Sequence, residues 1–396
     1  MNSFFRFDDP SISSPISLIY EDTFRQIKPK SKLVLHFDVN ETILIGDEAG
    51  GDTVHDCLNK IIAKCAYVRV DDASALTAKL TLKVTQDLEP TLWCDDQPIG
   101  SGNDDGCMKS APPLHIGWEW PKDCCPYYRT AFKKRSKSFV KSADGKVFSS
   151  IFEKLTSCML QYSPDHNLPE SHPFYRMIPS FFFTIIKLNE FNLDYSIVLR
   201  TFGTDLSDVA LAIDDFANGK HPLFPTFKDD KFCLKKENMF IGRYRRGLGE
   251  GESIYDLSQW DEKHKIVASG DDEVLEVIEN LFVCGIQDDY DFWDEHSNSP
   301  SCGKPVWIHP PNSEREYHHL FFDDNIHNDP TDSIVAVRTR KSDGHTWVSL
   351  TGEETLREHG RYLFRVPTIA VLLQYEWFLN SIAKAVQSQE QRSSKI

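Results

Sequence analysis

Acidic residues follow two short apolar runs of this 396-residue chain. Asp38 comes directly after the run 33–37, and the pair Asp323 and Asp324 comes directly after the run 319–322. A short apolar run bounded by polar residues is typical of a buried parallel strand. Because the carboxyl ends of parallel strands meet at one edge of a sheet, where ligands bind in such folds, we expect the three carboxylates to lie together.

Converging carboxylates repel one another, and a hard divalent cation that prefers oxygen ligands relieves this repulsion. The sequence therefore predicts a Mg²⁺ site formed by Asp38 with Asp323 or Asp324. A phosphate group would be attracted to such a site, and Asp38 could attack its phosphorus, as aspartyl-phosphate enzymes do. No Walker loop, dinucleotide fingerprint or Gly-x-Ser-x-Gly elbow occurs in the chain to favour a different chemistry.

A third apolar run, 195–199, is followed by Thr201 and Gly203. The Thr201 hydroxyl and backbone N–H groups near Gly203 could donate hydrogen bonds to the oxygens of a transferring phosphoryl group. Lys304 lies before the predicted strand that ends at Asp323 and could neutralise the remaining negative charge. Each residue also has a simpler explanation, since threonine is common in strands and most lysines lie at the surface.

Taken together, these motifs resemble the haloacid dehalogenase (HAD) superfamily. The first family motif is an apolar strand followed by Asp-x-Asp-x-Thr, and the chain reads LVLHFDVNETIL over 33–44. The second, third and fourth motifs resemble the segments around Thr201, Lys304 and Asp323–Asp324. The resemblance implies a Rossmann-like parallel sheet with helices on both faces and a large inserted cap.

The resemblance also implies roles for these residues in a Mg²⁺-dependent phosphoryl-ester hydrolase or phosphotransferase. Asp38 would be the nucleophile, with Thr201 and Lys304 as further catalytic contacts. The substrate contacts would be Asn40, Thr42 and Gly203, and the metal ligands Asp38, Asn40, Asp323 and Asp324. The expected partner is a small phosphorylated substrate or ligand.

Position 40 departs from the family pattern, because family phosphatases carry an acid/base Asp where this chain has Asn40. A carboxamide cannot exchange a proton near neutral pH, so acid–base help of typically ~10²–10⁴-fold would be missing. Branches without this Asp include phosphonatases and dehalogenases. The alternative is a catalytically impaired HAD-like module that binds a phosphorylated ligand or a protein partner. A third interpretation is a structural α/β protein whose acidic residues only cap strands.

The order of the motifs predicts a discontinuous core over 30–70 and 172–396. The cap or accessory region would be 71–171, where 80–84 alternates like a strand, and 1–29 would be an N-terminal extension. We expect helices over 54–68, 181–191 and 271–282, irregular structure over 220–268, and a closing helix over 362–386 with a break at Pro367.

The composition restricts the function classes. The formal net charge of −16 disfavours nucleic-acid binding, because phosphate backbones repel such a field. No apolar stretch reaches the ~18 residues that a membrane span needs, and the N-terminus does not resemble a secretory signal. The ten cysteines are scattered without a compact framework, and we expect reduced thiols in a cytoplasmic protein.

Overall fold

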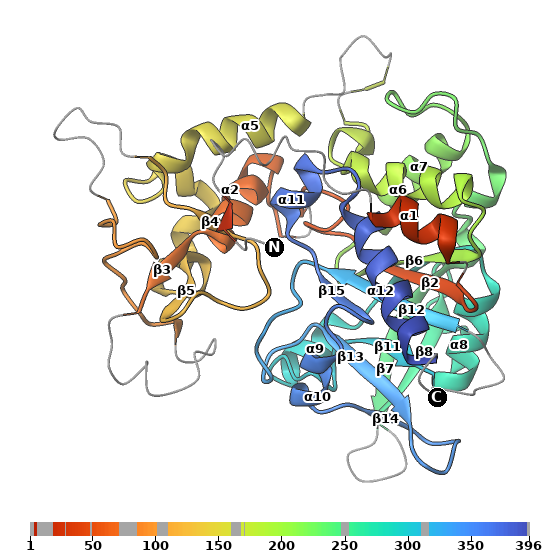
Figure 1. The fold of residues 1–396 in the computed structure, drawn as a ribbon. Helices are drawn as coiled ribbons and strands as arrows, with labels where there is room; N and C mark the ends of the chain where they lie inside the picture. The colour runs from red at the N-terminus through yellow and green to blue at the C-terminus, as the bar shows by residue number, and fades with distance from the viewer. Residues whose placement is uncertain are drawn as a thin grey trace.

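The computed structural model of the protein describes residues 4–5, 19–27, 29–47, 50–70, 85–100, 110–159, 168–169, 171–246, 253–309 and 317–393. Within these residues the fold is mixed α/β, built on one large sheet whose strands are mostly parallel (Figure 1). The predicted strand at 80–84 lies outside the described residues.

The central sheet has eight strands in the order β15-β12-β2-β6-β10-β7-β8-β9. All pairs from β15 to β7 are parallel, and β8 and β9 add antiparallel pairs at the far edge. The bounds, in sheet order, are β15 Leu363–Arg365, β12 Tyr317–Asp323, β2 Lys32–Asp38, β6 Tyr195–Thr201, β10 Val283–Gln287, β7 Met239–Arg246, β8 Ser253–Gln259 and β9 Ile266–Ser269. The runs predicted at 33–37, 195–199 and 319–322 are thus neighbouring parallel strands.

The two faces of the sheet are covered differently. On β2, Leu33, Leu35 and Phe37 pack into the main core with helices, and the Phe37 ring contacts Phe181 and Phe378. Alternate residues such as Val34 face the other way. The helices that contribute to the main core include α1 Ile19–Gln26, α6 Pro179–Glu190, α7 Leu206–Ala217, α11 Thr368–Leu373 and α12 Trp377–Ser393.

The opposite face meets one helix and a small second sheet. Helix α8 (Asp271–Asn280) packs there with Val34, together with Trp307 of β11. The second sheet has the order β11-β13-β14, with β11 Lys304–Ile308, β13 Val335–Arg340 and β14 Trp347–Ser349. The expectation of helices on both faces therefore holds only in part.

The segment 220–268 was expected to be irregular, and this prediction is wrong. It contains strands β7, β8 and most of β9, preceded by short 3₁₀ turns η7 Asp230–Phe232 and η8 Lys236–Asn238. Only the first half of β7 is buried, and its second half carries the exposed residues Arg243, Arg245 and Arg246. The polar half of β7 explains why the sequence pattern did not indicate a strand. A strand of an antiparallel pair that faces water lacks a continuous apolar run.

The C-terminal prediction needs a similar correction. Residues 363–365 form β15, α11 starts just after Pro367, and α12 follows as a separate helix. A strand and not a helix precedes Pro367, and the helical stretch is interrupted instead at 374–376, between α11 and α12. The other predicted helices are confirmed as α2 Val54–Cys65, α6 and α8, and α9 Tyr290–Glu295 and α10 Gly352–Arg357 are short additions.

The described part of the predicted insert packs around helix α2 (Figure 1). Its elements are β4 Leu114–His115, β5 Cys124–Pro126, η2 Tyr127–Arg129, η3 Ala131–Lys141, η4 Lys146–Phe148 and α5 Ser149–Met159. Strand β3 (Tyr67–Arg69) pairs with β5, β1 (Phe4–Phe5) with β4, and η6 (Pro173–Tyr175) leads back toward the sheet. The domain boundaries at 70 and 171 stay predictions, although α2 lies with the insert.

None of the helices in the described ranges is long and apolar enough to cross a bilayer. The cysteines within those ranges are free thiols.

Candidate functional site

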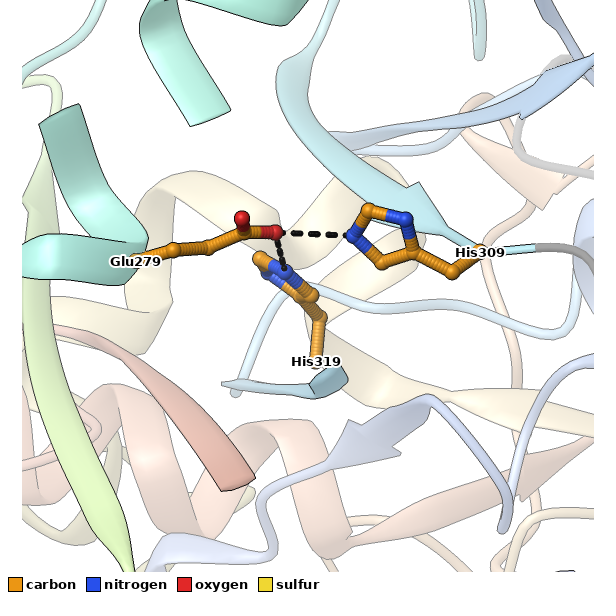
Figure 2. Close-up of side chains that lie close together, drawn as sticks. All are labelled: Glu279, His309 and His319. Atoms are coloured by element: carbon orange, nitrogen blue, oxygen red, sulfur yellow. Dashed lines mark hydrogen bonds and ion pairs between the residues drawn. The ribbon is translucent and has the colours of Figure 1, made fainter. Parts of the chain in front are cut away.

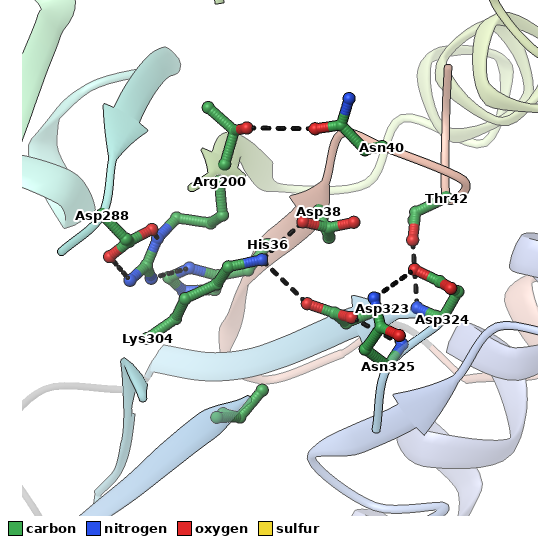
Figure 3. A network of polar contacts seen from close by, with 12 residues as sticks. His36, Asp38, Asn40, Thr42, Arg200, Asp288, Lys304, Asp323, Asp324 and Asn325 are labelled. Carbon is green, nitrogen blue, oxygen red and sulfur yellow. Dashed lines mark hydrogen bonds and ion pairs between the residues drawn. The ribbon is translucent and has the colours of Figure 1, made fainter. Parts of the chain in front are cut away.

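Three buried carboxylates meet at the carboxyl edge of the central sheet (Figure 3). Asp38 is the last residue of β2 and Asp323 the last residue of its parallel neighbour β12, with Asp324 following. Carboxylate oxygens of all three lie within 4.8 Å of one another, and each side chain is buried. The expected convergence of these residues is therefore present.

Lys304 places a buried ammonium group between Asp38 and Asp323. It begins β11 of the small sheet, and its Nζ donates to Asp38 Oδ1 at 2.5 Å and to Asp323 Oδ2 at 2.9 Å. Only 1% of the Lys304 side chain is exposed. Burial lowers the pKa of Lys304, but Asp323 and Asp38 outweigh burial, so its pKa is raised and the ammonium stays charged.

Asp38 lies in an excess of negative charge. Its pKa is raised well above the ordinary value, first by burial and then by the nearby Asp323, while Lys304 opposes the shift. Lys304 thus does not fully offset the effects of burial and of Asp323 on Asp38. Three buried carboxylates at this spacing are oxygen ligands suited to a hard divalent cation such as Mg²⁺, so the donor set fits that ion.

Asn40 occupies the centre of a second hydrogen-bonded group. Its Nδ2 donates to the Gly46 carbonyl at 2.9 Å and to Asp205 Oδ2 at 3.1 Å. Thr201 Oγ1 donates to Asn40 Oδ1 at 3.2 Å and accepts from the Gly203 N–H at 2.8 Å. The side chain of Asn40 therefore serves as donor and acceptor at once, which a carboxylate could not do.

Thr42 connects the first motif to the acidic pair. Its buried hydroxyl accepts a hydrogen bond from the backbone N–H of Asp324 at 3.1 Å. The structure thus places Asn40, Thr42, Thr201 and Gly203 beside the carboxylates, and each of them bonds to protein groups.

A ladder of ion pairs from helix α2 completes the site, and sequence reasoning missed it. Lys64 Nζ lies 2.7 Å from Asp324 Oδ2 and 2.6 Å from Glu41 Oε2, while Lys60 bridges Glu41 and Asp52 at 2.8 Å each. Burial raises the pKa of Asp324 to about 7, although Lys64 opposes the rise. The i,i+4 spacing of Lys60 and Lys64 on a predicted helix was the available signal.

Glu41 has a left-handed backbone with φ of 59°. Such a conformation costs about 1 kcal/mol or more in a residue other than glycine. The two lysines of α2 hold its carboxylate, and Thr368 Oγ1 donates to its carbonyl at 2.6 Å. The strained turn between Asp38 and Thr42 is therefore fixed by contacts from two other elements.

Arg200 is a second residue that sequence reasoning missed. It is fully buried on β6 and donates to Asp288 from Nε at 2.8 Å and from Nη2 at 2.6 Å. Its Nη1 donates to the carbonyl of Pro305 at 2.9 Å, and Pro305 follows Lys304 in the chain. An arginine inside an otherwise apolar run, one residue before Thr201, was the signal for such a buried pair.

A separate cluster joins Glu279 of α8 to two histidines (Figure 2). Glu279 Oε1 lies 2.8 Å from His309 Nε2 and 3.2 Å from His319 Nε2. His318 and His319 are buried residues of β12. Two imidazoles and a carboxylate are a ligand set that zinc accepts, so the protonation of the nitrogens decides whether a metal could bind.

The hydrogen bonds behind His319 determine its tautomer. Arg200 Nη1 can only donate, so His36 Nδ1, at 3.2 Å, accepts. Neutral His36 then donates from Nε2 to His319 Nδ1 at 3.0 Å, and the proton of His319 lies on Nε2, directed at Glu279. His319 Nε2, the nitrogen that a metal would need as a ligand, therefore carries a proton. The cluster is a hydrogen-bond network whose donors and acceptors are matched.

Comparison of the chain with protein-family models, with curated proteins and with solved structures finds no match.

Proposed function

We propose that the protein is a Mg²⁺-dependent phosphoryl-ester hydrolase or phosphotransferase of the HAD type, with Asp38 as nucleophile. The observation that carries the proposal is the convergence of Asp38, Asp323, Asp324 and Lys304 at the carboxyl edge of a parallel sheet. This is where ligands bind in such sheets, and the four side chains come from three different strands or loops.

The chemistry would proceed at the carboxylate of Asp38. One Asp38 oxygen forms a bond to phosphorus while the ester P–O bond breaks and the alcohol leaves with its electron pair. Water then attacks the aspartyl phosphate, and phosphate departs as the carboxylate is restored. A Mg²⁺ held by Asp38, Asp323, Asp324 and the Asn40 carbonyl would supply charge neutralisation for the phosphoryl oxygens.

The residues of this chain have complementary tasks in the proposed reaction. Lys304 fixes the orientation of Asp38 through its 2.5 Å contact and neutralises charge that accumulates on the phosphoryl group. Asn40 cannot protonate the leaving group, so substrates whose alcohols leave as stable anions should react fastest.

The experiment is hydrolysis of a phosphomonoester panel that includes 4-nitrophenyl phosphate, with and without Mg²⁺. We expect Asp38→Asn to lower turnover about a thousandfold or more, because it removes the nucleophile. Phosphate that is covalently bound to protein and released by hydroxylamine should form in the wild type and not in Asp38→Asn. The exposed Asp22→Asn variant is the matched control. Absence of Mg²⁺-dependent turnover throughout the panel would overturn the proposal.

The second candidate function is a non-catalytic module that binds a phosphorylated ligand or a protein partner. The saturated hydrogen bonding of Asn40 favours it, because no carboxylate stands where family phosphatases have one.

A simple Asn40→Asp change would place a carboxylate against Asp205 and the Gly46 carbonyl. The informative variant is therefore the exchange Asn40→Asp with Asp205→Asn, which keeps one amide and one carboxylate in contact. Activity in the exchange variant with none in the wild type would favour the non-catalytic module. Comparable activity in both would favour the enzyme.

A further inference from the structure

A pocket that Asp324 lines lies between the insert and the core. Its walls come from helix α2, from the segment 120–129 and from the chain around the end of β15. Asp324 is part of this pocket, and its carboxylate oxygens lie within 4.8 Å of those of Asp38 and Asp323. A molecule in the pocket would therefore adjoin the acidic site.

The charge of the pocket is opposite to that of the whole chain. Three cationic side chains line it, Lys64, Arg129 and Arg365, whereas Asp324 is the single acidic lining residue. Lys64 is committed to Asp324 and Glu41 through its ion pairs. The positive charge that is available to a ligand is thus that of Arg129 and Arg365.

The two arginines differ in how far they are neutralised. Arg129 Nη1 lies 3.1 Å from Asp332 Oδ2, so a carboxylate already shares its charge. Arg365 Nη2 donates at 2.7 Å to the Gly117 carbonyl, a neutral acceptor. A guanidinium carries five N–H donors, so both retain donors for a ligand, and Arg365 has the larger unshared charge.

Neighbouring polar groups respond to this positive field. His327, at the same pocket, has a pKa well below its ordinary value because of burial and then of Arg129, Lys64 and Arg365. The buried Tyr67 hydroxyl has no hydrogen-bond partner of standard geometry among the described residues. Burial raises the pKa of Tyr67 to about 12, with Arg365 opposing the rise, so the phenol is a neutral donor next to that arginine.

The remaining walls are apolar or aromatic, with Trp120, Val366 and Pro367 among them. We propose that this pocket binds a second anionic group of the substrate, a carboxylate or a phosphate held by Arg365 and Arg129, while the phosphoryl group to be transferred lies at Asp38. The inference rests on the proposed function and narrows its substrate class to small phosphate esters with a second acidic group.

Binding of non-hydrolysable ligands tests the anion pocket independently of any catalytic activity. Four non-hydrolysable probes are titrated calorimetrically in the presence of Mg²⁺: phenylphosphonate, its 4-carbamoyl and 4-carboxy derivatives, and benzene-1,4-diphosphonate. The carbamoyl derivative matches the carboxy derivative in size without its charge. The diphosphonate distinguishes a phosphate subsite from a carboxylate subsite. The proteins are the wild type, Arg365→Gln, Arg129→Gln and the exposed control Arg357→Gln.

We expect the wild type to bind the carboxy derivative or the diphosphonate at least about tenfold more tightly than the carbamoyl derivative, as charge-assisted hydrogen bonds would provide. This gain should disappear in Arg365→Gln, decrease in Arg129→Gln and persist in Arg357→Gln. Equal binding of charged and neutral probes, a gain that survives in Arg365→Gln, or no binding of any probe would overturn the inference.

Turnover of the phosphomonoester panel by the wild type is measured in parallel and tests only the proposed function. Turnover without a charge-dependent gain would overturn the pocket assignment and retain the enzyme. A charge-dependent gain without turnover would retain the anion pocket and overturn hydrolysis.

Discussion

At the scale of single residues, Asp38 and Asp323 both bind the ammonium group of Lys304, and this contact balances part of their negative charge. Lys304 contacts both carboxylates while it is almost completely buried, so its removal would leave two acids facing each other without a cation. Loss of one partner from a buried charge group is far more costly than loss of a surface pair.

Lys304→Met should therefore lower the free energy of unfolding of the metal-free protein by about 3 kcal/mol or more. Mg²⁺ should then raise the thermal midpoint of the variant by more than it raises that of the wild type, because the ion would replace the missing positive charge. Thermal unfolding with and without Mg²⁺ measures both effects. The exposed Lys134→Met variant is the control. An identical Mg²⁺ effect in wild type and Lys304→Met would contradict the assignment of these carboxylates as ligands.

At the scale of elements, one buried arginine connects four strands. Arg200 on β6 binds Asp288 just beyond β10, contacts His36 on β2 and donates to Pro305 on β11. Tyr255 on β8 also donates to Asp288 at 2.5 Å. These contacts hold the small sheet against the large one. Lys304, the first residue of β11, is the side chain that the small sheet contributes to the carboxylate site.

Arg200→Met should destabilise the fold by about 3–5 kcal/mol, since it leaves Asp288 charged and unpaired in the interior. Adding Asp288→Leu should recover part of this loss, so that the double variant is more stable than the sum of the single changes predicts. Urea unfolding of the four proteins gives the coupling energy. Arg246→Met, at the exposed end of β7, is the comparison for loss of an arginine. Strict additivity would argue against a coupled pair.

At the scale of the whole molecule, buried neutral histidines make the stability depend on pH. His221 is fully buried among Phe174, Phe182 and Phe224, and it accepts from the Leu223 N–H at 3.2 Å. Burial, with a smaller effect of His172, lowers the pKa of His221 to about 3. The unfolded chain therefore binds one more proton than the folded chain between pH 6.5 and pH 3.

Because the unfolded state takes up this proton, the free energy of unfolding falls as the pH falls below 6.5, by about 1.4 kcal/mol per pH unit for this histidine. His221→Asn keeps an acceptor for Leu223 but cannot be protonated. Between pH 6.5 and pH 5, the free energy of unfolding of this variant should change less steeply with pH than that of the wild type. The difference in slope should correspond to about one proton taken up on unfolding. Denaturant titrations across this range measure the slope, with the exposed His264→Asn as control. An unchanged slope in His221→Asn would show that another group takes up the proton.

Much of the central sheet was predictable, because its middle strands are continuous apolar runs that end in polar residues. β2, β6 and β12 are buried on both faces, and this environment produces the apolar pattern from which they were inferred. The strands β7 and β8 were missed, because a ribbon with one solvated half carries mixed residues. The same reasoning placed Asp38, Thr201 and Asp323 together, since parallel strands end at one edge.

By itself, the sequence determined which residues end the strands and that a carboxamide, Asn40, lies two positions after Asp38. Only the tertiary structure decided which charges compensate each other. Lys304 belongs to another sheet, Arg200 and Asp288 lie 88 positions apart, and Lys64 reaches Asp324 across 260 positions. Local patterns arise from burial along one element, whereas these pairs depend on how separate elements pack. The arginine-lined pocket has the same origin, because its walls come from the insert and from the far end of the chain.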